Sequence, residues 1–66
     1  MNILLKLPFG KYRDRSVRQM VEADVNYAHW ALSKPWFSRL YPEHANGVRR
    51  LLVQRLKAEL EAEELA

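Results

Sequence analysis

Basic side chains recur at every second position of one short segment. Lys11, Arg13 and Arg15 alternate with other residues, and Arg18 follows three positions later. Alternate side chains of an extended segment share a face, so this spacing predicts a row of cations that reaches successive phosphates of a nucleic-acid backbone. Tyr12 would point to the opposite face, where it either stacks on a base or packs in the core. The alternative is that the basic row is only a solvated edge.

Residues suited to catalysis or metal binding are sparse. The sequence has no cysteine, and its serines show no spacing with a histidine and an acid that would indicate a nucleophile. Its two histidines, His29 and His44, lack the spacing of paired zinc ligands. We therefore expect no catalytic residue, no metal and no cofactor, and we expect that the protein is not an enzyme.

The net charge of +3 is unevenly distributed. Residues 1–50 contain nine Lys or Arg against four Asp or Glu, a balance of +5, whereas residues 51–66 contain two against four, a balance of −2. This distribution favours phosphate binding by the basic residues 1–50 and not by the acidic C-terminal segment.

The segments that carry the basic row predict a hairpin. Residues 3–7 and 9–12 read as strands of a small N-terminal antiparallel sheet, with residues 16–17 completing it and Asp14 in the turn. Two strands alone are marginal in water, so helices must cover one face. We therefore predict an α+β fold. A chain of 66 residues is long enough for one small domain, residues 1–66.

Helices are expected over the rest of the chain. Ser16 and Gln19 form a capping-box pattern ahead of apolar residues, and prolines favour helix starts and stops. The predicted elements are short helices over residues 16–22 and 24–33, a helical turn over residues 36–41, and one long C-terminal helix over residues 43–64.

Aromatic residues are the largest side chains available for the core. Tyr27 and Trp30 are one helical turn apart, and Trp36 and Phe37 follow at a bend. Their spacing favours burial over a role as stacking platforms, with Trp30 as the foremost core residue. Trp36 and Phe37 are adjacent on a short turn, so both cannot easily face inward.

The C-terminal helix carries an apolar stripe that the preceding residues are too few to cover. Val48, Leu52, Leu56 and Leu60 lie four residues apart. The surplus is either a frayed tail or the contact surface of a homodimer, in which two helices pair antiparallel and the basic start of one meets the acidic end of the other.

The sequence resembles the exodeoxyribonuclease X-like C-terminal domain family over residues 7–41. The resemblance is carried by PFGKYR at residues 8–13, by Tyr27 and Trp30, and by WFSRLYP at residues 36–42. Asp14 stands where the family usually has glycine, and aspartate tolerates the same left-handed conformation. The family is a small accessory module of a nuclease that also occurs alone in short bacterial and phage proteins. The resemblance implies an association with nucleic-acid processing.

Two classes of function follow. The first is a non-catalytic accessory module that binds nucleic acid, DNA in particular, without sequence specificity through the basic hairpin. The alternative is a small protein-interaction module, or a phage-type effector that docks on a host protein. The short apolar stretch at the N-terminus lacks the features of a targeting signal or a membrane span, so we expect a cytoplasmic protein without a membrane partner.

Overall fold

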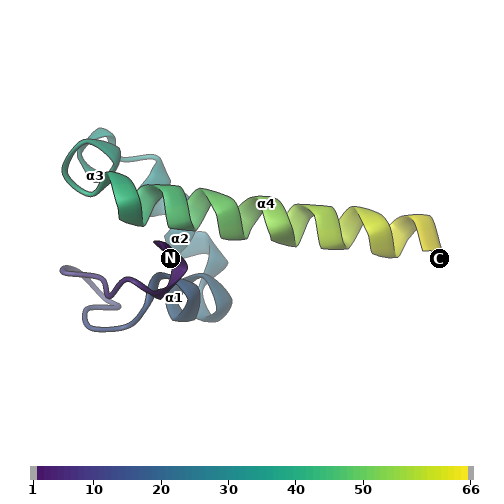
Figure 1. Ribbon diagram of the computed structural model, residues 1–66, viewed down its shortest axis with the longest axis horizontal. Helices are drawn as coiled ribbons and strands as arrows, with labels where there is room; N and C mark the ends of the chain where they lie inside the picture. Colours follow the sequence, from purple (N-terminus) through teal and green to yellow (C-terminus); the bar gives the residue numbers. More distant parts are fainter. Residues whose placement is uncertain (1, 66) are drawn as a thin grey trace.

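The computed structural model describes residues 2–65, with the side chains of residues 3–63. This part of the chain forms one 3-10 helix and four α-helices: η1 (Asn2–Leu4), α1 (Val17–Ala23), α2 (Val25–Leu32), α3 (Pro35–Leu40) and α4 (Pro42–Leu65). Three of the α-helices are short, whereas α4 runs along most of the length of the molecule (Figure 1).

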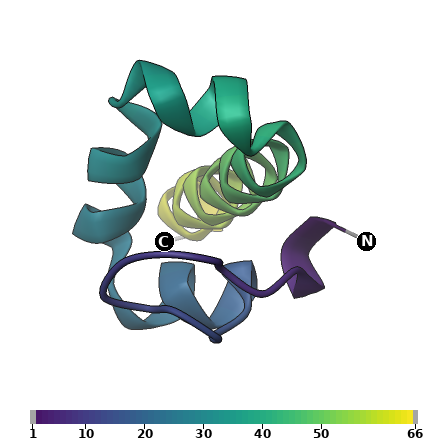
Figure 2. The same cartoon turned by 90° about the vertical axis from the view of Figure 1, so that its left-hand side faces the viewer.

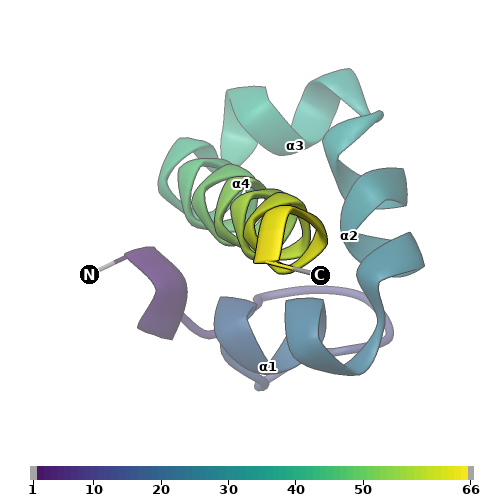
Figure 3. The same cartoon turned by 90° about the vertical axis from the view of Figure 1, so that its right-hand side faces the viewer.

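Seen along α4, the other elements form an open ring around its first half (Figure 2, Figure 3). η1, α1, α2 and α3 all contact α4. The rest of α4 extends past this ring, so the molecule measures 40 Å in one direction and 22 and 21 Å in the other two. The side chains of residues 53–63 are all exposed, and we refer to this segment as the projecting half of α4.

The core lies inside the ring. Phe37 of α3 is fully buried, and Ala28 and Ala31 give α2 a small-residue face that lets it approach the other helices closely. The buried cluster comprises Leu7, Val17, Met20, Val21, Ala28, Ala31, Phe37, Ala45 and Val48. No residue of the cluster lies beyond Val48, so the core depends on the first half of α4 alone.

Local sequence signals place the helix starts as predicted. The hydroxyl of Ser16 accepts a hydrogen bond from the Gln19 N–H at 3.1 Å, and the Gln19 side chain accepts one from the Ser16 N–H at 2.9 Å, which completes the capping box. Asp24 caps the start of α2. Pro35 and Pro42 are the first residues of α3 and α4, where a missing N–H costs nothing. The four predicted helical segments are confirmed, each to within about two residues.

The predicted α+β class is wrong. Residues 2–65 contain no β-strand, and the only sheet-like pairing among them is an isolated bridge between Lys6 and Ser16. Residues 2–4 form η1 in place of a strand, and residues 9–14 are bends and turns. Gly10 and Asp14 have positive φ values of 76° and 68°, which no regular strand accommodates. The fold is all-helical, and the predicted basic hairpin is a loop.

The predicted burial of Trp30 is also wrong, since 44% of this residue is exposed. Ala28 and Ala31 occupy the inward face of α2, which leaves Trp30 on its flank. Phe37 takes the central place, and its neighbour Trp36 is only partly buried. Trp36 and Phe37 therefore divide between flank and core, as their adjacency predicted.

Candidate nucleic-acid interface

The basic residues at positions 11–15 lie on a loop, residues 8–15, which we call the basic loop. Its ends are joined by hydrogen bonds from the Leu7 N–H to the Arg15 carbonyl (2.9 Å) and from the Asp14 N–H to the Leu7 carbonyl (3.0 Å). Within it, the Arg13 N–H donates to the Gly10 carbonyl (3.2 Å). These bonds satisfy the backbone locally, so the loop keeps one shape without a partner strand.

Asp24 at the start of α2 ties this loop to the helices. Its Oδ2 accepts hydrogen bonds from the Lys11 ammonium at 3.2 Å and from the Tyr12 hydroxyl at 3.1 Å, while its Oδ1 caps the Tyr27 N–H at 3.0 Å. One carboxylate therefore serves both as helix cap and as loop anchor. The anchoring role was not predicted; the sequence indicated only that Asp24 starts a helical run, a position typical of a cap.

Tyr27 is the second anchor. Its hydroxyl accepts a hydrogen bond from the Lys11 backbone N–H at 3.3 Å, and its ring packs edge-on against the Tyr12 ring with centroids 5.2 Å apart. The space for a side chain at Gly10 is occupied by the Tyr27 hydroxyl. The loop therefore approaches α2 closely through a glycine that also supplies the positive φ.

The anchoring contacts shift three ionisation equilibria. The Tyr27 N–H, and then the Lys11 ammonium, stabilise the carboxylate of Asp24 and lower its pKa. The hydrogen bond to Asp24 raises the pKa of Lys11. Desolvation, followed by the hydrogen bond to Asp24, raises the pKa of Tyr12. At neutral pH these shifts favour an anionic Asp24, a cationic Lys11 and a neutral Tyr12 that donates its proton.

The five predicted site residues separate into two groups. Lys11 and Tyr12 face Asp24, and the Arg18 guanidinium pairs with Glu22 at 3.1 Å one helical turn away. Arg13 and Arg15 are exposed, and no carboxylate of the described residues lies within ion-pair distance of either. The predicted row along one extended face is therefore absent. Of the four basic residues among the five, only Arg13 and Arg15 have no ion pair among the described residues.

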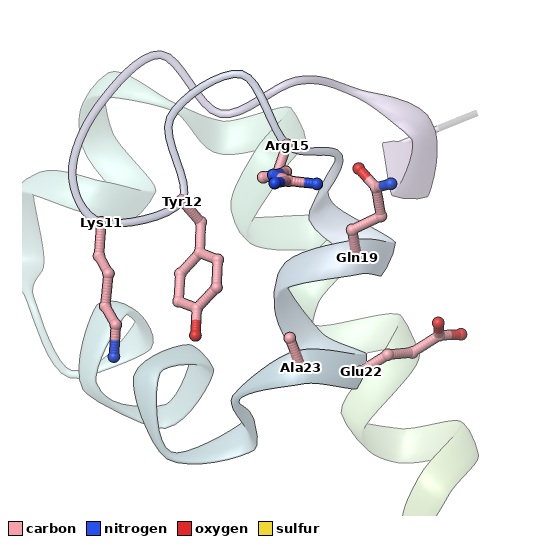
Figure 4. A pocket seen from close by; sticks show the side chains of 6 residues that line it. All are labelled: Lys11, Tyr12, Arg15, Gln19, Glu22 and Ala23. Atoms are coloured by element: carbon pink, nitrogen blue, oxygen red, sulfur yellow. The ribbon is translucent and has the colours of Figure 1, made fainter.

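An open hollow of about 600 Å³ lies between the basic loop and α1. Figure 4 shows Lys11 and Tyr12 on one side of it, Arg15 near its upper edge, and Gln19, Ala23 and Glu22 on the α1 side. Both charge signs border this hollow. The acid Glu22 at its border and its opening to solvent argue against a closed pocket for a small anion.

A second feature that sequence reasoning missed lies on α2 beside the loop. The half-exposed Trp30 ring packs against the Tyr27 ring, with centroids 5.2 Å apart, and the Lys34 ammonium lies 5.4 Å from the Trp30 centroid. Helical spacing placed Trp30 on the same helix as Tyr27 but could not distinguish the flank of that helix from its inward face.

The histidines do not assemble a metal site in the described part of the chain. His44 Nε2 lies 2.9 Å from the Lys6 carbonyl oxygen, a contact that holds α4 to the segment after η1. No group of three or more His, Cys, Asp or Glu side chains within residues 3–63 is close enough to hold a metal ion. Of the helices within residues 2–65, none combines the length and apolar character needed to cross a membrane.

Comparison with protein-family models, curated proteins and solved structures found no match to this chain. The resemblance to the exodeoxyribonuclease X-like C-terminal domain, carried by the residues of the basic loop, α2 and α3, therefore stays a prediction.

Proposed function

We propose that this protein is a non-catalytic nucleic-acid-binding module that contacts phosphates through the basic loop, without base specificity. The observation that carries the proposal is that Arg13 and Arg15, two exposed guanidiniums without a carboxylate partner among the described residues, lie two positions apart on one loop. Their loop is fixed by its own backbone and by Asp24. A cation held on a preorganised backbone loses less conformational entropy when it binds phosphate than one on a flexible tail.

The remaining basic residues support the same surface. Lys11 and Arg18 are paired, but both side chains are more than half exposed. Exposed ion pairs contribute little to stability, so either cation can turn toward a phosphate at small cost. Tyr12 serves the interface indirectly in this proposal, because its ring and hydroxyl fix the loop against α2.

The test is a fluorescence-anisotropy titration of labelled 20-nucleotide DNA, single-stranded and duplex, against the full chain. We expect the double variant Arg13→Gln/Arg15→Gln to weaken binding by about tenfold or more at low salt. The matched control Arg39→Gln/Arg50→Gln removes the same charge from exposed positions of α3 and α4 outside the basic loop and is expected to bind nearly as well as the wild type. Equal losses in the two variants would mean that only net charge matters, and the basic loop would not be the interface.

A second candidate function is a contact between two copies of the chain through the projecting half of α4. Val53, Leu56 and Leu60 are each at least half exposed along one side of this helix. When Leu56 of one copy is placed opposite Leu60 of an antiparallel copy, Lys57 lies on the same flank of the pair as Glu61 of the other copy. Arg55 and Glu59 of the other copy share the opposite flank. Apolar contact and opposite charges then coincide, which favours a homodimer over an unpaired helix.

A further inference from the structure

Among the Phe, Tyr and Trp residues that the structure describes, Trp30 is the most exposed, with 44% of its surface accessible. Its indole is nonetheless well positioned. The Tyr27 ring packs against it at 5.2 Å with a tilt of 35°, and the Trp36 ring meets it edge-on at 6.4 Å. The indole is thus held on two sides and open to solvent elsewhere. A small domain that leaves one of its two largest side chains half exposed forgoes burial that would have stabilised it.

Positive charge flanks this indole. The Lys34 ammonium lies 5.4 Å from the Trp30 ring centroid, and no carboxylate of the described residues lies within ion-pair distance of Lys34. On the other side, the Tyr27 ring lies between Trp30 and the basic loop. Tyr27 packs against Trp30 and also against Tyr12 of the loop, each at 5.2 Å. The ring of Trp30 therefore lies between a lysine and the loop that carries the free arginines.

An aromatic face between cations matches the chemistry of a nucleotide in a single strand. Each unpaired base has a π-face that stacks on an aromatic side chain, and each is flanked by phosphates that attract cations. The bases of a duplex are already stacked and expose only their edges, so a fixed indole cannot reach their faces. The Lys34 side chain is long, and its ammonium can leave the ring for a phosphate when a base covers the indole.

We infer that Trp30 is a stacking platform for an unpaired base and that the preferred ligand is single-stranded nucleic acid. Lys34 contacts a phosphate beside this base, and the arginines of the basic loop contact phosphates farther along the same strand. The inference deepens the proposed function and rests on it, because the loop supplies phosphate contacts on one side of the platform.

The experiment measures the affinity of the full chain for oligo-dT of 20 nucleotides and for a 20-base-pair duplex. Trp30→Ala is expected to weaken binding to the single strand by about 5- to 100-fold and to leave duplex binding within about twofold of the wild type. Trp30→Phe keeps an aromatic face and should recover most of the loss. Leu40→Ala removes a side chain on α3 that is 61% exposed and is expected to change neither affinity.

A second readout uses the intrinsic fluorescence of Trp30. In a Trp36→Phe background, Trp30 is the only tryptophan, and oligo-dT is expected to quench its emission whereas the duplex is not. Circular-dichroism melting of each variant separates loss of binding from loss of fold.

The outcomes distinguish the inference from the proposed function. Full single-strand affinity in folded Trp30→Ala, together with weakened binding in Arg13→Gln/Arg15→Gln, would overturn the stacking inference alone. Equal losses for single strand and duplex in Trp30→Ala would overturn it as well. If the wild type bound neither oligonucleotide, the proposed function would fail and the inference with it. Self-association that Trp30→Ala abolishes would assign the indole to a protein contact instead.

Discussion

The basic loop and the projecting half of α4 are both exposed, but different interactions determine their structures. The loop is fixed by backbone hydrogen bonds across its base, by the Asp24 carboxylate and by the Tyr27 hydroxyl. The projecting half of α4 is regular helix whose side chains, residues 53–63, are all exposed. The loop therefore depends on specific tertiary contacts, whereas this helix segment depends on its own backbone.

The comparison shows that exposure has different consequences in the two regions. An exposed arginine on an anchored loop is solvated and its backbone is already positioned, so binding a phosphate orders only its side chain. A row of exposed leucines is unfavourable in water, and covering it with another apolar surface lowers the free energy. A change to an anchor should thus alter the fold and the proposed binding together, whereas a change in the projecting half of α4 should alter association only.

The largest effect is expected when the loop is forced away from α2. Gly10→Ala adds a side chain where the Tyr27 hydroxyl lies and imposes a positive φ on alanine. We expect the free energy of unfolding to fall by about 1–3 kcal/mol, measured by urea denaturation. Asp14→Gly is the matched control in the same loop, because glycine accepts the φ of 68°. Its stability should stay within about 1 kcal/mol of the wild type. If Gly10→Ala were equally harmless, the close approach of loop and helix would be wrong.

A smaller effect is expected from the charge of Asp24. Asp24→Asn keeps an oxygen that can cap the Tyr27 N–H but removes the anion that binds Lys11. We expect a lower melting temperature at pH 7, by roughly 2–5 °C. Asp14→Asn, which removes an exposed carboxylate from the same loop, should melt as the wild type does.

The pH dependence of this effect has a definite sign. The folded protein lowers the pKa of Asp24 from its ordinary 3.8, so the anion contributes stability above the unfolded pKa. That contribution is lost as the pH falls through the folded pKa. The difference in melting temperature between the wild type and Asp24→Asn should therefore shrink below about pH 4. A difference that grew on acidification would contradict the assignment of Asp24 as an anionic anchor.

The smallest effect on the fold is expected in the projecting half of α4. Leu56→Gln/Leu60→Gln should leave the free energy of unfolding of the monomer within about 0.5 kcal/mol of the wild type. If α4 pairs with a second copy, light scattering of the wild type at micromolar concentration gives a dimer mass and the double variant gives a monomer mass. Leu40→Gln, on α3, is the control for an exposed leucine outside α4. A monomer mass for the wild type would reject the homodimer.

The sequence was sufficient for the helices because their signals are local. Ser16 and Gln19 act within one turn, and Pro35 and Pro42 act on their own backbone. The prediction of a strand over residues 9–12 was wrong because the pattern of side chains and the conformation of the backbone disagree there. The alternation of Lys11, Arg13 and Arg15 has the period of a strand, but Gly10 and Asp14 place the backbone in turns that pair internally.

The parts of the site that escaped prediction depend on contacts distant in sequence. Lys11 and Asp24 are 13 residues apart, and the residues next to each of them in sequence do not indicate that the two will pair. The exposure of Trp30 follows from the burial of Ala28 and Ala31 on the other side of α2. Large aromatics are usual core residues, so periodicity alone favoured the wrong face. Packing between helices decided both features.

The central claim is that the anchored loop binds nucleic-acid phosphates through Arg13 and Arg15, and the salt dependence of binding tests it most directly. The logarithm of the association constant for oligo-dT, plotted against the logarithm of salt concentration, falls by about 0.7 per phosphate contact. We expect a wild-type slope of about −2 or steeper, and a slope shallower by about 1.4 in Arg13→Gln/Arg15→Gln. The control Arg39→Gln/Arg50→Gln should keep a slope closer to that of the wild type. An identical slope in the wild type and in Arg13→Gln/Arg15→Gln would contradict the claim.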